Sequence, residues 1–169
     1  MNNFLKLTES QKRSVFNAIA HKVGLPAQVV EKDFWVTAVL QTLFSLPISR
    51  YLVFKGGTSL SKGWKLIERF SEDVDLAIDP SVFGVSDGDL TKKQIKKLRK
   101  ASSLFVLEEL TPTLTNELSS LGMGSFISCE AQPNGLATTH IPNLVRSIFI
   151  TSLYLSTPST TYVRILSSR

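Results

Sequence analysis

The sequence predicts an α+β fold in a single domain spanning residues 1–169. Three observations lead to this fold class: helical apolar patterns over residues 8–45, short β-prone runs separated by a glycine turn in the middle, and a C-terminal third rich in β-branched and hydroxyl side chains. At 43% hydrophobic and 20% charged residues, the chain is long enough to bury a core. No repeat or long linker divides it, so we expect N-terminal helices followed by a core over residues 51–166.

The first two elements are predicted helices. Thr8-Glu9-Ser10-Gln11 has the capping-box pattern, and apolar residues recur at helical spacing until Gly24. The next helix starts at Pro26 and runs to about Phe44, with apolar residues on more than one face. We therefore expect the second helix to be well buried.

The middle of the chain predicts a strand, a glycine turn, a helix and a second strand. Tyr51–Phe54 is a β-prone run, and residues 58–65 are expected to form a brief helix capped by Thr58 or Ser59. The run Val74–Ile78 alternates polar and apolar residues, as a strand with one polar face does. Trp35 and Trp64 both lie in helical patterns and are expected in the core.

The second half predicts a long helix and then strands. Residues 91–110 begin with another capping pattern, Thr91 to Gln94, and Thr111-Pro112 interrupts the helix before a further helical stretch to about Leu121. Runs near 125–130, 145–155 and 161–166 are β-prone. With the earlier strands they predict a mixed sheet of four or five strands.

Composition excludes several classes of function. Cys129 is the only cysteine, so the chain has no internal disulfide and no multi-cysteine zinc site, which is typical of a reducing compartment. No export signal precedes the first helix and no run approaches 18 apolar residues, so we expect a cytoplasmic protein without a membrane span. The net charge of +5 lies wholly in the second half, because residues 1–90 hold ten basic and ten acidic side chains.

An acidic pair is the first candidate for chemistry. Asp73 and Asp75 are two residues apart in a predicted strand, so they share a face at about 6.5–7 Å. Paired carboxylates suit Mg²⁺, which combines them with phosphate oxygens and water, and two such ions can clamp an in-line displacement. A solvent-facing acidic pair at a sheet edge is the alternative interpretation.

A glycine turn is the second candidate. Gly56 and Gly57, followed by Thr58 and Ser59, let phosphate oxygens approach backbone N–H groups at a helix N-terminus. The turn does not match the Walker A pattern. Two cations, Lys55 before the turn and Arg69 before the acidic strand, are placed to neutralise phosphate charge. A tight turn with a solvated Lys55 is the alternative.

These segments together resemble a known family. The motifs are Phe54–Leu60, Glu68–Leu76 and the preceding Glu31-Lys32-Asp33-Phe34-Trp35. In this order they resemble the nucleotidyl transferase AbiEii/AbiGii toxin family, which belongs to the DNA polymerase β-like nucleotidyltransferases. The similarity is dense over residues 28–79 and looser to about residue 165.

The resemblance implies a nucleotidyltransferase-like mixed sheet flanked by helices. In such a fold the turn at Gly57 and Thr58 would hold the triphosphate of an NTP, and Asp73 and Asp75 would bind two Mg²⁺. The implied reaction transfers NMP to a hydroxyl acceptor, and the expected acceptor is RNA such as a tRNA 3′ end. The implied setting is a bacterial toxin–antitoxin or phage abortive-infection system with a cognate antitoxin. Residues 31–35 are interpreted as packing and helix N-terminal electrostatics.

The C-terminus departs from the family pattern. Leu166 stands where the family shows a third carboxylate, and the family's helical C-terminal region is absent, so we expect a truncated product with little or no turnover. Glu130 is a weak candidate to replace that carboxylate, because it lies on an earlier predicted strand. A non-catalytic remnant that binds nucleotide, RNA or an antitoxin is the alternative to an enzyme. A glycosyltransferase using Asp-x-Asp is disfavoured, since its chemistry does not need the glycine turn.

One further feature is a run of basic residues in the predicted helix 91–110. Six of the nine residues from 92 to 100 are Lys or Arg. They suit an RNA backbone, and a solvated helix face is the alternative interpretation.

Overall fold

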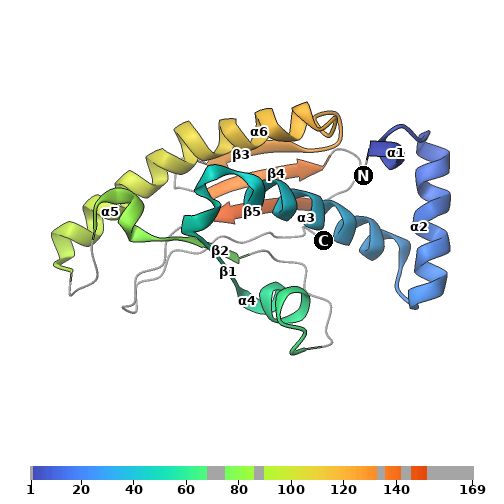
Figure 1. Cartoon of the computed structure of the whole chain (residues 1–169), viewed down its shortest axis with the longest axis horizontal. Coiled ribbons are helices and arrows are strands. Elements are labelled where there is room, and N and C mark those ends of the chain that lie inside the picture. The colour runs from blue at the N-terminus through green and yellow to red at the C-terminus, as the bar shows by residue number, and fades with distance from the viewer. Residues whose placement is uncertain (1, 68–74, 86–89, 133–135, 142–145, 152–169) are drawn as a thin grey trace.

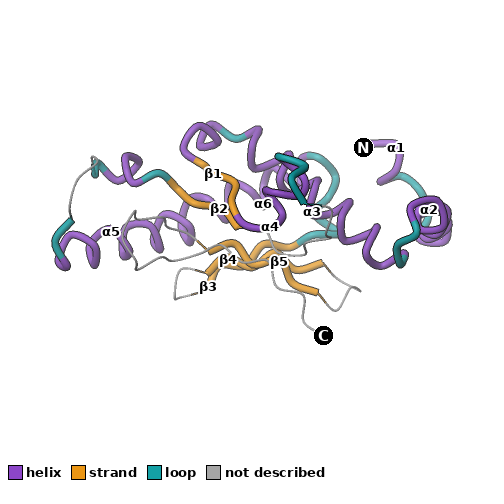
Figure 2. Tube along the Cα trace, turned by 90° about the horizontal axis from the view of Figure 1, so that it is seen from below, coloured by secondary structure: helices purple, strands orange, loops and turns teal. Residues whose placement is uncertain are grey.

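The computed structural model describes residues 2–67, 75–85, 90–132, 136–141 and 146–151. Helix α6 packs on a three-stranded sheet, α3 lies beside α6, and α2 and α5 lie at opposite ends of the molecule (Figure 1). Seen from below, the three-stranded sheet forms a layer beneath α3 and α6 (Figure 2). The described residues therefore confirm the α+β class and the N-terminal helical segment.

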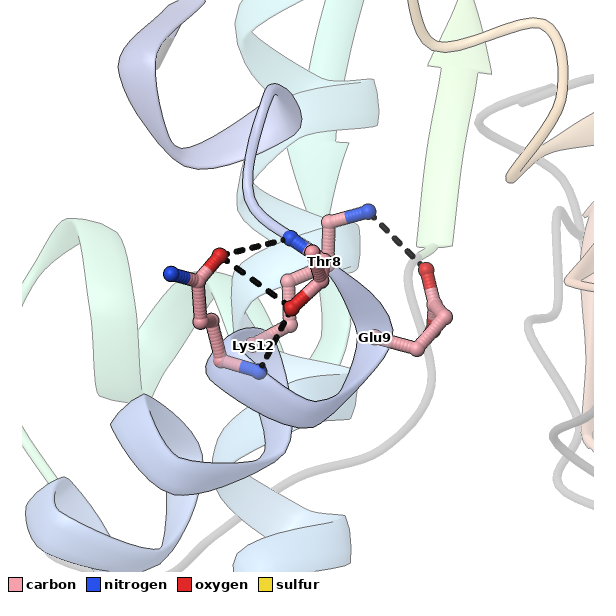
Figure 3. Close-up of polar contacts among 4 residues, drawn as sticks. Thr8, Glu9 and Lys12 are labelled. Atoms are coloured by element: carbon pink, nitrogen blue, oxygen red, sulfur yellow. Dashed lines mark hydrogen bonds and ion pairs between the residues drawn. The ribbon is translucent and has the colours of Figure 1, made fainter.

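The N-terminus forms a short helix, α1 (Asn2–Leu5), and then α2 (Glu9–Val23). The predicted capping box is confirmed, because the Thr8 side chain accepts from the Gln11 backbone N–H while Gln11 Oε1 accepts from the Thr8 N–H (Figure 3). Gly24 ends α2 at φ 69°, a left-handed conformation that glycine adopts without strain.

Helix α2 contains a buried lysine, Lys12, whose ammonium group is in contact with a carboxylate and an aromatic ring. Lys12 is 5% exposed, and its Nζ lies 3.0 Å from Glu9 Oε1 (Figure 3). The same Nζ lies 4.0 Å from the Phe126 ring centroid. An ion pair together with a cation–π contact offsets part of the cost of removing the ammonium from water. α2 is thus joined to the turn that precedes the C-terminal sheet.

Helix α3 (Ala27–Ser45) supplies the centre of the core, as its apolar pattern predicts. Trp35 is 2% exposed and stacks on Phe126 with ring centroids 5.3 Å apart. The largest core cluster joins α3 to strands β1 and β2 and to the helices near residue 110; among its buried members are Val39, Leu43, Leu76, Ile78, Val106, Leu114 and Leu118. Burial of a large apolar side chain of this kind contributes about 1.5–3 kcal/mol.

The strands form two antiparallel ladders among the described residues. After a 3-10 helix, η1 (Pro47–Tyr51), β1 (Leu52–Lys55) pairs with β2 (Asp75–Ile78). The second ladder has the order β3 (Ser128–Gln132), β4 (Leu136–Ile141), β5 (Arg146–Thr151).

This arrangement differs from the single mixed sheet that the sequence predicts, since no described strands pair in parallel. β4 was not expected, because its sequence Leu-Ala-Thr-Thr-His-Ile has only weak apolar alternation. The predicted strand 161–166 lies outside the described residues. β4 pairs with β3 on one side and with β5 on the other, and a central strand takes its conformation from these two neighbours.

Helices α5 (Lys92–Phe105) and α6 (Thr111–Ser120) are joined by the π-helical segment η4 (Val106–Leu110), so the predicted interruption at Pro112 is wrong. A proline inside an α-helix loses a hydrogen bond and clashes with the carbonyl one turn earlier. Widening the turn into a π-helix just before Pro112 accommodates both defects. The result is one continuous helical rod.

Candidate functional site

The candidate site begins where β1 ends. Lys55 has extended backbone angles and Gly56 has φ 73°, so the chain turns sharply at a position that a side chain would strain. The three-residue α4 (Gly56–Thr58) leads directly into η2 (Ser59–Gly63), a π-helical turn. The predicted strand, glycine turn and helix are therefore present.

The hydroxyl residues of this turn face the protein. Thr58 is 0% exposed and Ser59 is 5% exposed. The Ser59 hydroxyl donates to the Phe54 carbonyl at 2.9 Å, which ties the turn back to β1. Neither residue is a side-chain cap, so the predicted capping role is wrong: Lys55 occupies the N-cap position, without a side-chain hydrogen bond. Because these two side chains are buried, the groups of the turn that are left for a ligand are its backbone N–H groups.

The acidic strand meets the turn through the sheet register. Asp75 is the first residue of β2, and its Cα is the cross-strand partner of Lys55, the residue that immediately precedes Gly56. Cross-strand partners in an antiparallel pair are about 4.5–5.5 Å apart. For Asp75 only the backbone is described, and Asp73 and Arg69 lie outside the described residues. Register thus brings the backbone of one predicted metal ligand beside the glycine turn.

Beyond Asp75 the strand is buried on both faces. Leu76, Ala77 and Ile78 are 3%, 4% and 1% exposed. The prediction of one polar face is therefore wrong for these residues, because Leu76 and Ile78 belong to the main core cluster and Ala77 is buried as well. A strand fixed by burial holds its first residue in a defined position, which suits a residue that must bind a ligand.

A second contact holds the turn from the side of α3. Lys62, in η2, forms an ion pair with Asp33 and donates to Thr37 Oγ1 at 3.3 Å. Both acceptors are on one face of α3, one turn apart. No sequence pattern predicts this pairing, since Asp33 and Lys62 are far apart along the chain. Together with the Ser59 bond, it fixes the turn from two directions.

The segment Glu31–Trp35 packs as expected but does not act on the helix N-terminus. α3 begins at Ala27 and has no acidic residue in its first turn, so the electrostatic interpretation is wrong. Burial raises the pKa of Glu31 above its usual range. The indole N–H of Trp35 acts against this shift in pKa, although it lies outside hydrogen-bonding geometry.

Comparison with known protein families identifies the group to which this turn and strand belong. A family model described as "Nucleotidyl transferase AbiEii toxin, Type IV TA system" matches residues 39–142, more than half of the chain. This chain belongs to the AbiEii family. No curated protein and no solved structure matches it. AbiEii proteins are the nucleotidyl transferase toxins of a type IV toxin–antitoxin system, and membership implies a cognate antitoxin partner.

The AbiEii match covers the glycine turn and both aspartates, and it leaves out Glu31–Trp35 and the run at residue 166. It therefore supports the family resemblance over the two motifs on which the predicted site rests. The match does not reach the part of the chain where a third carboxylate is expected.

One tryptophan of this AbiEii protein was placed wrongly by its sequence pattern. Trp64 is 71% exposed, whereas a core position was expected. It follows the last residue of η2, and the next residue, Lys65, has φ 54°, which is uncommon for a residue with a side chain. The helical pattern around Trp64 ends too early for its ring to reach the core.

Two features of the described residues concern metal binding and membrane crossing. Among the residues with described positions, no three His, Cys, Asp or Glu side chains come together as metal ligands, but Asp73 is not among those residues. Within the same residues, no helix combines the length and apolar character that crossing a bilayer requires.

Proposed function

We propose that this AbiEii protein binds an NTP at the Gly56–Gly57 turn and transfers its NMP to a hydroxyl of RNA, such as a tRNA 3′ end. The observation that carries the proposal is the register of β1 and β2, which pairs Lys55 with Asp75 at the mouth of the turn. A phosphate-binding turn and a carboxylate strand that meet at one point suit a metal-bound triphosphate. The family name supports the reaction class.

The donor set fits Mg²⁺. Carboxylate oxygens are the ligands that this ion prefers, and Asp73 and Asp75 would hold it. When bound, Mg²⁺ neutralises phosphate charge and stabilises the developing charge on the leaving group. Lys55 and Arg69 would add positive charge, and the N–H groups of residues 56–59 would orient the phosphates.

In the proposed reaction an acceptor hydroxyl attacks the α-phosphorus of the NTP. The new bond joins the acceptor oxygen to that phosphorus, the bond between the α-phosphorus and the bridging oxygen breaks, and pyrophosphate leaves with the bond electrons. The hydroxyl proton passes to a base or to water. Both substrates are cytoplasmic, which agrees with the lone cysteine, and we propose that location for the activity.

A second candidate is Mg²⁺-dependent nucleotide binding without transfer. It is favoured by Leu166, which stands where the family resemblance places a carboxylate. Two Mg²⁺ carry four positive charges, so an alkyl group in place of one anionic ligand weakens the ion that activates the nucleophile. This candidate retains nucleotide, RNA or antitoxin binding and loses turnover.

The test separates binding from transfer. The chain is incubated with each radiolabelled NTP, Mg²⁺ and total tRNA, and NTP binding is measured in parallel by equilibrium dialysis. Asp73→Asn and Asp75→Asn are compared with Asp79→Asn, a matched control whose exposed carboxylate accepts from the Ser81 N–H.

Labelling of tRNA that is lost in the first two variants and kept in the control supports the transferase. Magnesium-dependent binding without labelling, with the same dependence on Asp73 and Asp75, supports the second candidate. If no NTP binds, or if Asp79→Asn is as damaging as Asp75→Asn, both proposals are wrong.

A further inference from the structure

Helix α5 carries a one-sided cluster of positive charge. Its sequence, Lys-Lys-Gln-Ile-Lys-Lys-Leu-Arg-Lys-Ala-Ser-Ser-Leu-Phe, contains no acidic residue. At 100° per residue, the six cations fall within an arc of about 160°. All six are exposed; they are Lys92, Lys93, Lys96, Lys97, Arg99 and Lys100, called here the α5 basic face.

The opposite side of α5 is fixed against the protein. Leu98 is 2% exposed and packs against Phe83, Val85 and Leu90, and Ser102 is 1% exposed. These contacts prevent the helix from rotating about its axis, so the α5 basic face points to solvent. Because the apolar side is already covered, α5 cannot insert it into a lipid surface as an amphipathic membrane helix does.

The positions of these positive charges lower the stability of helix α5. Lys92 and Lys93 lie in the first turn, where the helix dipole disfavours cations. Lysines four residues apart, such as Lys92 and Lys96, repel one another. Among the described residues, no carboxylate forms an ion pair with any of the five lysines.

A surface that serves only solubility mixes both signs of charge. α5 does not, and the two acidic residues just before it, Asp87 and Asp89, still leave the segment strongly positive. Like charges gathered on one face of a helix lower its stability. Such a face is expected where an anion outside the protein supplies the negative charge that the helix lacks.

We propose that the α5 basic face binds the phosphate backbone of RNA. Lysine is depleted from protein–protein interfaces, whereas phosphate contacts need cations without an apolar centre. The face is also connected to the candidate site, because β2 leads directly into η3 (Pro80–Phe83), which packs on α5. The inference rests on the proposed RNA acceptor and adds the surface on which it docks.

The test measures RNA binding with no NTP and with EDTA present, so that its result does not depend on nucleotidyl transfer. The probe is a fluorescent RNA hairpin with a single-stranded 3′ end, followed by anisotropy over a range of salt concentrations. The variant Lys92→Gln/Lys96→Gln/Lys100→Gln is compared with Lys6→Gln/Arg13→Gln/Lys22→Gln, which removes the same charge from exposed positions of the α1–α2 region.

We expect the α5 variant to lose on the order of 100-fold in affinity near 0.1 M salt, and its log–log salt slope to fall by about two to three. The control should change by less than a few-fold. The α5 variant should also melt at an equal or higher temperature, because like charges are removed, and this excludes unfolding as the cause.

Four outcomes would overturn the proposal. The first is equal loss of affinity in both variants, which indicates only net charge. The second is unchanged binding by the α5 variant. The third is competition by polyglutamate as effective as that by RNA, which points to an acidic protein as the partner. Weaker competition by duplex DNA than by the hairpin would support RNA as the source of the phosphates, and equal competition would contradict it.

Discussion

Helices α2 and α5 begin in the same way and use their charges in opposite ways. Each has a threonine N-cap and a glutamine three residues later, with both hydrogen bonds of the capping box formed. α2 has Glu9 in its first turn and His21 and Lys22 in its last, as the helix dipole favours. α5 has Lys92 and Lys93 in its first turn and no acidic residue.

Capping and charge placement are therefore independent features of these two helices. In α2 the charges stabilise the helix and even anchor the buried Lys12. In α5 the caps and the apolar side provide the stability, which leaves the charged side available for another purpose. If this is so, the two helices should respond alike to changes in packing and capping and differently to changes in charge.

The largest effect is expected from the apolar anchors. Phe16 is 5% exposed and contacts Phe4 and Phe34, while Leu98 is the buried centre of the small cluster under α5. Phe16→Ala should lower the free energy of unfolding by about 3–5 kcal/mol and Leu98→Ala by about 2–5 kcal/mol. Urea denaturation measures both. A loss below about 1 kcal/mol at Leu98 would show that α5 is not docked as described.

The next effect concerns the two caps. Thr8→Ala removes the acceptor for the Gln11 backbone N–H, and Thr91→Ala removes the acceptor for the Gln94 backbone N–H. Each change should lower the free energy of unfolding by about 1 kcal/mol. Thr→Ser at either position keeps the acceptor and serves as the control. A clear difference between the two caps, measured by thermal unfolding, would contradict their equivalence.

Charge exchange should separate the helices by sign. Lys92→Glu should stabilise the protein by about 0.3–1 kcal/mol, because it favours the dipole and relieves repulsion from Lys96. Glu9→Lys should destabilise it by at least as much, since it also leaves Lys12 without its carboxylate. Denaturation at low and high salt tests both, and the stabilisation in α5 should shrink as salt rises. Destabilisation by Lys92→Glu would remove the basis of the comparison.

The smallest effect is expected from two carboxylates near these helices. Burial raises the pKa of Glu31, which faces Glu9 and Arg13 of α2, so the folded state holds its proton to higher pH than the unfolded state. The stability should therefore fall as pH rises above about 4.5 and then level off. Glu31→Gln should flatten this decline in a series of denaturation curves.

The pKa of Asp79, before η3, is shifted the other way. Hydrogen bonding from the Ser81 N–H lowers it, so the contribution of Asp79 to stability is present above pH 3.8 and lost as the pH falls. Asp79→Asn should remove this acid-side loss only. If the two variants flattened the same part of the curve, the assigned directions would be wrong.

Much of the local structure follows from sequence patterns. The boundaries of α2, its capping box and Gly24 could be predicted because short-range hydrogen bonds and backbone preferences decide them. The glycine turn between β1 and the next helix could be predicted for the same reason. β4 was missed because its pairing with β3 and β5, rather than its own apolar pattern, decides its conformation. The continuous helix through Pro112 was missed because the π-helical turn that accommodates the proline leaves no simple apolar pattern.

At the candidate site, the residue types follow from the sequence: two glycines, an acidic strand and the motifs of the AbiEii family. The folded structure sets the pairing of Asp75 with Lys55, the hydrogen bond from Ser59 to the Phe54 carbonyl and the ion pair between Lys62 and Asp33. It also decided that Trp35 is buried and Trp64 exposed. The physical reason is that caps and turns arise from interactions within a few residues, whereas register, burial and long-range ion pairs depend on which surfaces the folded chain brings together.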